Sequence, residues 1–415
     1  GQACSDYADS LWLFGRIFPD AAGWVLTGCG IQSRREAFEE KQVGGKADGG
    51  EVTYRVLPHT QTKISTIGIG SSAIHESSGD EIQRIFDYAA DRGINLVDTV
   101  MSDFSAAALM GKAMEGKRDK FVTQMHIGAT YPGDTYTRTR NVAQVKEGFE
   151  KQLKTFRTDY SDIGLIHYVD QDGDYDDMLN NGLLDYAQKL KQDGVIRNIG
   201  FSSHSVDMCH RFLDTGLIDV FMFSINPSYD FVSSGSGMTL DEGRKKLYER
   251  AQQMGVGITV MKAYGGSRLL SDASSPFGKA MTPVQCIQYC LDRPAVVSVI
   301  PGVRHMMDVK TAMLYYSASP EERSYTDILR AKVQNMDGVC IYCGHCQPCI
   351  KAIDIAAVNK FYDLAQAGDA LAKEHYLQLP HKAGDCIQCG HCEPRCPFHV
   401  AIRERMKQTK AYFGE

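Results

Sequence analysis

The chain has 415 residues, of which 43% are hydrophobic, enough to bury one large core and a smaller appended one. Its 45 Lys and Arg residues against 51 Asp and Glu give a formal net charge of −6, so the composition offers no basic footprint for nucleic acid. No apolar run reaches about 18 residues, the length that a membrane-spanning helix needs.

Residues 1–51 form an N-terminal extension that ends in V-G-G-K-A-D-G-G-E, a composition typical of a linker. Within it, Ser33, Arg34 and Arg35, followed by Phe38, resemble a twin-arginine export signal. The residues that come next, E-E-K-Q-V-G-G-K, are polar where such a signal would be apolar. We therefore expect a cytoplasmic protein, with export as the alternative.

Residues 52–324 alternate short apolar strands with amphipathic helical patterns. The predicted strands are 64–70, 94–98, 121–126, 162–167, 196–202, 219–224, 257–262 and 296–301. They are nearly continuously apolar, as strands buried on both faces are. Eight such repeats predict an α/β fold, a TIM (β/α)8 barrel, and no G-x-G-x-x-G follows the first strand to favour an open dinucleotide-binding sheet.

Polar residues end several of the predicted strands, where a barrel carries its chemistry. They are Asp98, His126, His167, Ser202 with Ser203 and His204, and Lys262. A single polar strand end is more often a cap or a turn residue, but several at one face of a barrel favour a site. The acidic run from Asp170 to Asp177 predicts a solvated loop beside that site, since it lacks the spacing of a calcium loop.

Two cysteine runs dominate residues 325–415, which we expect to form a small helical ferredoxin-like domain. The first run is Cys340, Cys343, Cys346 and Cys349, and the second is Cys386, Cys389, Cys392 and Cys396. The second run, closed by Pro397, has the C-x2-C-x2-C-x3-C-P spacing of proteins that hold two [4Fe–4S] clusters. Zinc ribbons are the alternative, but zinc needs only four ligands per site and gives no reason for the Cys-Pro ending.

The last cysteine of each run ligates the other cluster in such ferredoxins. We therefore assign Cys340, Cys343, Cys346 and Cys396 to cluster I, and Cys386, Cys389, Cys392 and Cys349 to cluster II. A disulfide framework is not expected, because thiols at this spacing in a chain with no clear secretory signal favour a reducing compartment.

Several stretches of the barrel carry a resemblance to a known family. They are R-G-I-N-L-V-D-T over 92–99, D-I-G-L-I-H-Y over 162–168, D-G-V-I-R-N-I-G-F-S-S-H-S over 193–205 and V-I-P-G-V-R over 299–304. The chain resembles the aldo-keto reductases over about residues 52–400, in the branch that carries a C-terminal ferredoxin-like module. The resemblance implies NAD(P)H bound across the barrel mouth and carbonyl reduction by an Asp-Tyr-Lys-His tetrad.

Only part of that tetrad is matched. Asp98 and His167 correspond to its aspartate and histidine, but Asp103 stands where the tyrosine is expected and Met125 where the lysine is expected. A positioned general acid contributes about 10²–10⁴ in rate, so another group must replace the tyrosine if the barrel is catalytic. Asp103 qualifies only if burial raises its pKa, whereas His167 and His126 titrate closer to neutral pH.

The resemblance also implies positions for the dinucleotide. Ser202 and Ser203 offer hydroxyls for the nicotinamide carboxamide, and Gly302, Arg304 and His305 offer partners for phosphate. We therefore expect NADP(H), with a flavin as an alternative cofactor.

The sequence thus predicts an iron–sulfur oxidoreductase that couples chemistry on a small-molecule substrate, or on NAD(P)H, to electron transfer through two [4Fe–4S] clusters. Its expected partner is a redox protein such as a ferredoxin, a flavodoxin or another oxidoreductase subunit. The alternative is a non-catalytic electron-transfer or scaffold subunit with a degenerate barrel.

Overall fold

The computed structural model of the chain describes residues 41–42, 50–234, 237–326, 338, 340, 346–366, 371–396 and 399–415. Most of the predicted extension, including the arginine pair, lies outside these residues. Its described part, β1 (Lys41–Gln42), pairs antiparallel with β2 (Thr53–Val56). The role of residues 1–51 stays a prediction.

The central element is a parallel sheet of eight strands in the order β15-β14-β11-β10-β9-β6-β5-β4. Its strands are β4 (Ile69–Gly70), β5 (Leu96–Asp98), β6 (Val122–Ile127), β9 (Ser161–Ile166), β10 (Ile196–Ser203), β11 (Val220–Ser224), β14 (Gly257–Met261) and β15 (Val296–Val299). Parallel bridges from Ile67 to Val299 and from Gly70 to Gly302 join the first strand to the last and close the barrel. The predicted TIM barrel is confirmed.

The first predicted strand, 64–70, is divided in two. β3 (Lys63–Ser65) pairs antiparallel with β2, and only β4 enters the barrel. The Ser65 hydroxyl donates a 2.7 Å hydrogen bond to the Ile67 carbonyl, and this bond gives a backbone acceptor its partner at the bend between β3 and β4. Leu57 and Ile64 of this hairpin are fully buried with apolar side chains from the barrel strands, so the hairpin packs against the barrel interior.

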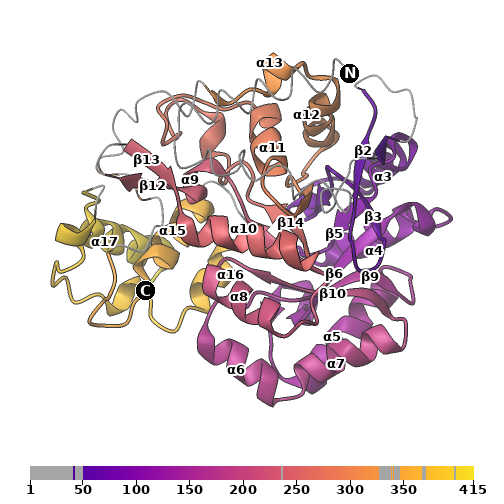
Figure 1. The fold of residues 1–415 in the computed structure, drawn as a ribbon. Coiled ribbons are helices and arrows are strands. Elements are labelled where there is room, and N and C mark those ends of the chain that lie inside the picture. Colours follow the sequence, from indigo (N-terminus) through magenta and orange to yellow (C-terminus); the bar gives the residue numbers. More distant parts are fainter. Residues whose placement is uncertain are drawn as a thin grey trace.

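Helices surround the barrel, as Figure 1 shows. They are α3 (Gly79–Arg92), α4 (Ser105–Ala113), α5 (Val142–Thr155), α6 (Asp172–Asn180), α7 (Leu183–Gln192), α8 (Val206–Asp214), α9 (Pro227–Asp230), α10 (Glu242–Met254), α11 (Pro283–Leu291), α12 (Met306–Ser317) and α13 (Pro320–Arg323). In α3, Ile82, Ile85 and Phe86 are buried at helical spacing. Ser78 caps its N-terminus and left-handed Gly93 (φ 84°) ends it.

Two antiparallel hairpins extend the βα connections. They are β7 (Ala129–Thr130) with β8 (Thr137–Arg138), and β12 (Phe231–Ser234) with β13 (Gly237–Leu240). The first hairpin follows β6 directly, so it lies at the end of the barrel where the strands terminate. It positions a tyrosine of the candidate site.

A buried carboxylate joins three of these helices. Asp230 is completely buried and accepts hydrogen bonds from Arg244 Nε (2.7 Å), the Tyr248 hydroxyl (2.7 Å) and the Tyr289 hydroxyl (2.9 Å). Asp230→Ala leaves the Arg244 guanidinium buried without its counter-charge, so we expect a loss of about 3–5 kcal/mol in the free energy of unfolding. Urea unfolding measures this.

The matched control is Asp214→Ala, which removes a carboxylate that is 67% exposed and pairs with Arg250 on the surface. Its expected effect is within about 0.5 kcal/mol. Equal effects of the two substitutions would contradict the stabilising role of Asp230.

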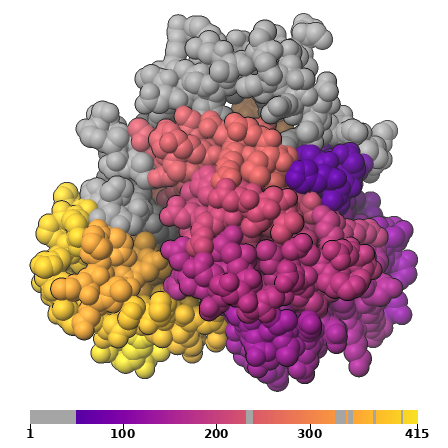
Figure 2. Space-filling view, turned by 60° about the horizontal axis from the view of Figure 1, so that its bottom comes forward, coloured from indigo at the N-terminus to yellow at the C-terminus, as the bar shows by residue number. Residues whose placement is uncertain are grey.

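The C-terminal part has its own apolar core and lies against the barrel (Figure 2). Its helices are α15 (Ile355–Gln366), α16 (Ala372–Leu377) and α17 (Ile402–Phe413). Asp363 of α15 joins the two parts, because it pairs with Arg268 of the barrel (3.1 Å) and with Arg405 of α17 (2.6 Å). The predicted helical character is confirmed. None of the described helices has the length and apolarity needed to cross a membrane.

Candidate functional site

Three residues predicted at strand ends form one buried hydrogen-bonded line. Asp98 ends β5, His126 lies near the end of β6, and His167 follows β9 directly. Their exposed fractions are 2%, 1% and 4%. His126 Nε2 lies 2.8 Å from Asp98 Oδ1, and His126 Nδ1 lies 2.7 Å from His167 Nδ1. The barrel therefore brings these predicted residues together.

Tyr136 extends this line and was not predicted. It lies between β7 and β8, is 1% exposed, and places its hydroxyl 2.6 Å from His167 Nε2. Burial raises the pKa of Tyr136 above its usual value, so the phenol keeps its proton. Burial, with His126 and His375 nearby, lowers the pKa of His167 well below its usual value, so the ring is neutral. A protonated phenol thus meets a neutral imidazole.

His375 adds a residue from the C-terminal part of the chain. It lies on α16, and its ring stacks on that of Tyr168 with centroids 4.4 Å apart and planes 5° apart. His375 Nε2 is 3.4 Å from the Tyr136 hydroxyl. Tyr168 directly follows His167 and has a strained positive φ of 50°. The C-terminal part therefore supplies a side chain to the end of the barrel.

The hydrogen bonds of this line are consistent with one orientation. Asp98 Oδ1 also accepts from the Gln124 amide (2.8 Å), so we assign the proton between Asp98 and His126 to His126 Nε2. His126 Nδ1 then accepts from His167 Nδ1, and His167 Nε2 accepts from the Tyr136 hydroxyl. The order Tyr136–His167–His126–Asp98 resembles a catalytic triad of hydroxyl, imidazole and carboxylate. Here the hydroxyl belongs to a tyrosine, and two imidazoles separate it from the carboxylate.

Asp103 does not meet the condition for a replacement acid. It is exposed and lies at the start of α4, where its carboxylate accepts a 2.9 Å hydrogen bond from the backbone N–H of Ser105. That bond lowers the pKa of Asp103 rather than raising it. Met125, in the lysine position, is fully buried. We therefore do not assign proton transfer to Asp103.

A second buried polar group lies beside the first. Asp170 Oδ1 accepts from the Ser203 hydroxyl (2.9 Å) and the His204 N–H (2.6 Å), and Asp170 Oδ2 lies 2.9 Å from His204 Nδ1. Burial alone would raise the pKa of Asp170, but His204 and Lys360 hold it below its usual value. The predicted acidic loop is instead helix α6 from Asp172 on.

Two lysines belong to this second group. Lys262 follows β14 with a positive φ of 62°, and burial, assisted by Lys360, lowers its pKa to about 7. Lys360 comes from α15 and is 9% exposed, and burial lowers its pKa to about 8. A lysine of the C-terminal part thus reaches the same region as His375. Lys262 was predicted at this strand end, whereas Lys360 was not.

The predicted dinucleotide residues fit that cofactor in part. The Ser202 hydroxyl accepts a 2.8 Å hydrogen bond from Tyr168 N–H, and the Ser203 hydroxyl is bonded to Asp170. Arg304 pairs with Glu76 (3.1 Å), while Gly302 and His305 are exposed. The serine hydroxyls are therefore engaged within the protein. The Gly302–His305 segment is more exposed, but Arg304 pairs with Glu76 and His305 lies 3.5 Å from Glu81.

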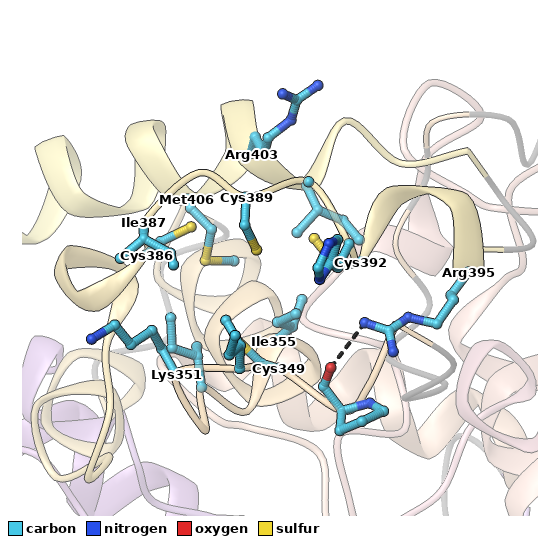
Figure 3. A pocket seen from close by; sticks show the side chains of 16 residues that line it. Cys349, Lys351, Ile355, Cys386, Ile387, Cys389, Cys392, Arg395, Arg403 and Met406 are labelled. Atoms are coloured by element: carbon cyan, nitrogen blue, oxygen red, sulfur yellow. Dashed lines mark hydrogen bonds between the residues drawn. The ribbon is translucent and has the colours of Figure 1, made fainter.

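Four cysteines line one cavity of the C-terminal part: Cys349 of the first run with Cys386, Cys389 and Cys392 of the second. Figure 3 shows these side chains arranged around the same space. Within the described residues, no three His, Cys, Asp or Glu side chains gather closely enough to hold one metal ion. Thiols placed around a cavity suit a group with an iron at each of four corners better than a single tetrahedral ion.

The other cysteine set is more enclosed. Cys346 and Cys396 are each 8% exposed, Cys340 is half-buried, and Cys343 lies outside the described residues. Cys346, Cys396 and Tyr168 belong to one buried apolar cluster. No disulfide joins the cysteines that the structure describes. Cys392 of the other set is 9% exposed and belongs to the same apolar cluster, whereas Cys389 is exposed.

Comparison with known proteins agrees with this architecture. The aldo/keto reductase family model matches residues 66–283, and the 4Fe-4S dicluster domain model matches residues 339–401. The chain belongs to the aldo/keto reductase family of oxidoreductases and carries a 4Fe-4S dicluster domain behind its barrel.

Curated relatives include the aldo-keto reductase YhdN of Bacillus subtilis, 28% identical over 38% of this chain and 49% of its own length. The uncharacterized oxidoreductase YqkF of Bacillus subtilis is 23% identical over 60% of this chain and 86% of its own. D-arabinose 1-dehydrogenase of Saccharomyces cerevisiae is 25% identical over 38% of this chain and 48% of its own. In the first and third, the match spans about half of the relative.

Among solved structures, the holo form of an aldo-keto reductase from Bacillus halodurans superposes with a TM-score of 0.55. It is 22% identical, and the match covers 68% of this chain and 96% of that one. This likeness shows the barrel fold.

Proposed function

We propose that this protein is an iron–sulfur oxidoreductase that reduces or oxidises a small organic substrate beside Tyr136 and His167, and that exchanges the electrons with an external carrier through two [4Fe–4S] clusters. The observation that carries the proposal is the contact between the two parts of the chain. His375 of the dicluster part stacks on Tyr168 and reaches the Tyr136 hydroxyl of the barrel. The proposed proton-exchanging phenol therefore lies where the two parts meet.

The ligands we propose for cluster I are Cys340, Cys343, Cys346 and Cys396, and those for cluster II are Cys349, Cys386, Cys389 and Cys392. Each cluster, when bound, carries one electron at a time. Reduction of a carbonyl to an alcohol takes two electrons and two protons. The two clusters would supply the electrons, Tyr136 would supply the proton to the oxygen, and solvent would supply the proton to the carbon. Cys346, Cys392 and Cys396 share one apolar cluster with Tyr168, which supports electron exchange between the clusters and the barrel.

The proton chemistry follows from the orientation of the hydrogen bonds. Tyr136 is the general acid or base, because its hydroxyl can exchange a proton with a substrate oxygen and with His167 Nε2. His167 and His126 orient the Tyr136 hydroxyl through their hydrogen bonds, and Asp98 fixes the tautomer of His126. Tyr136 would thereby replace the tyrosine that is missing from the family tetrad.

NADP(H) remains a proposal for the Gly302–His305 segment, where Arg304 would receive phosphate. No step of this account uses it, since the serine hydroxyls expected to bind nicotinamide are already engaged. A flavin receives no support from the relatives. The buried site favours a small-molecule substrate, and the dicluster domain favours a redox partner. A cytoplasmic location stays a prediction.

The experiment compares wild type with His167→Ala, both purified and assayed without oxygen. Each holoprotein is supplied with a low-potential donor and, in separate reactions, aldehydes, ketones, 2-oxo acids and the corresponding alcohols. We expect donor-dependent turnover in wild type and its loss in the variant, with iron and acid-labile sulfide unchanged at about eight each. A scaffold protein would instead show no turnover in either form while still passing electrons to a partner.

A further inference from the structure

Two isoleucines are strongly exposed beside the cavity that Cys349, Cys386, Cys389 and Cys392 line. Ile350 is 70% exposed and Ile387 is 55% exposed, and both contribute to the rim of this cavity. Each directly follows one of the cysteines in sequence. Adjacent exposed aliphatic side chains around an opening often mark a surface that another protein covers.

Basic side chains surround the same opening. Lys351, Arg395 and Arg403 line the cavity together with the two isoleucines, as Figure 3 shows for the labelled residues. Glu393 neutralises Arg403 through a 2.8 Å ion pair. Within the described part of the chain Lys351 forms no ion pair, and Arg395 donates a hydrogen bond to the Pro348 carbonyl (2.8 Å). The side chains of this rim are therefore net positive, on a chain whose net charge is −6, and they surround the negative charge that four thiolates and a cluster would place in the cavity.

We propose that this face, which we call the cluster rim and define by Ile350, Lys351, Ile387 and Arg395, docks a small acidic electron-carrier protein. The inference rests on the proposed function, because it assumes that the neighbouring cysteines hold cluster II. Positive charge around the opening attracts the acidic partner over a distance, and the isoleucines supply the apolar contact once it has docked. A contact built on these four residues suits a weak, short-lived electron-transfer complex, the class with the smallest protein–protein interfaces.

The rim lies beside the cysteine set that includes an exposed thiol, where a carrier protein could approach a cluster closely. Cys389 is exposed at the rim, whereas Cys346 and Cys396 of the other set are each 8% exposed. A carrier at the rim would exchange an electron with cluster II. The carrier is oxidised by one electron as cluster II is reduced, or the reverse, and no bond is made or broken.

The test uses the holoprotein and a reduced plant-type [2Fe–2S] ferredoxin, an acidic protein, in stopped-flow experiments without oxygen. We expect the second-order rate constant for wild type to fall as salt rises. In the Lys351→Glu, Arg395→Glu double variant, we expect that rate constant to fall about tenfold or more at low salt and to lose this salt dependence. Reduction by dithionite, which needs no docking, should be unchanged.

The matched control is the Lys120→Glu, Lys310→Glu variant, which makes the same charge change at two exposed lysines of the barrel. It should react with ferredoxin as wild type does. A rim variant that keeps its iron and sulfide and still reacts at the wild-type rate would overturn the docking proposal alone. Wild type that lacks iron, or that neither ferredoxin nor dithionite reduces, would instead overturn the proposed function on which it rests. The single Lys351→Glu variant repeats the test if the double variant loses iron.

Discussion

Replacing Tyr136 with phenylalanine is expected to lower turnover by about 10²–10⁴-fold, the usual contribution of a positioned general acid or base. The substitution removes the hydroxyl that lies 2.6 Å from His167 Nε2 and leaves the ring in its buried place. Because the ring packing is kept, the fall should appear chiefly in kcat, with a loss of about 1–3 kcal/mol in stability from the His167 Nε2 acceptor left without its donor. Turnover of the holoenzyme with its donor and substrate measures it.

Tyr131→Phe is the matched control. Tyr131 is 2% exposed, and its ring centroid lies 6.2 Å from that of Tyr136, but its hydroxyl is outside the line that ends at Asp98. We expect this variant to keep wild-type turnover. If both variants lost activity equally, the cause would be disturbed packing around the hairpin, and the role given to the Tyr136 hydroxyl would be wrong.

Exchanging single cysteines for serine should remove the cluster of the other run. Cys349→Ser should damage the cluster held by Cys386, Cys389 and Cys392, because these four side chains line one cavity. Cys396→Ser should damage the cluster of the first run. In each variant the iron content should fall from about eight to about four per chain. Each variant should keep one cluster. Electron paramagnetic resonance of the reduced protein identifies which cluster is kept, since the two variants should lose different signals.

Cys209→Ser serves as the control for these variants, since Cys209 is a fully buried thiol of α8 in the barrel. It should retain all of its iron. Loss of the first-run signal in Cys349→Ser would show that each run closes its own cluster. Zinc without sulfide in wild type would contradict the cluster assignment altogether.

The barrel could be predicted because its strands are apolar runs that leave a clear pattern in the sequence. The positions of Asp98, His126 and His167 followed from the same pattern, since parallel strands of a barrel end at one face. The division of 64–70 into β3 and β4 was not predictable in this way, because Ile64 and Ile69 are both apolar and buried. The bend depends on the hydrogen bond from Ser65 and on pairing with β2.

The residues that complete the candidate site could not be predicted from local pattern. Tyr136 reaches His167 from a hairpin, and His375 meets Tyr136 across 239 positions of sequence. Such long-range contacts depend on how separate elements pack, and the hydrophobic periodicity of each element does not specify that packing. Asp103 is the opposite case. Its position in the sequence corresponds to the tyrosine of the family tetrad, but the fold leaves it exposed at the start of α4. The connection after β6 contains two tyrosines, Tyr131 and Tyr136, and nothing in the sequence distinguishes them.

The most direct test of the account is a single turnover without oxygen and without nicotinamide. The clusters are first reduced by dithionite, excess reductant is removed, and the protein is mixed with the carbonyl substrate found in the turnover screen. We expect the cluster absorbance to return as about one alcohol forms per two electrons, and we expect His167→Ala to stay reduced. Alcohol formed only when NADPH is added, with the clusters unchanged, would contradict the coupling of the barrel to the clusters.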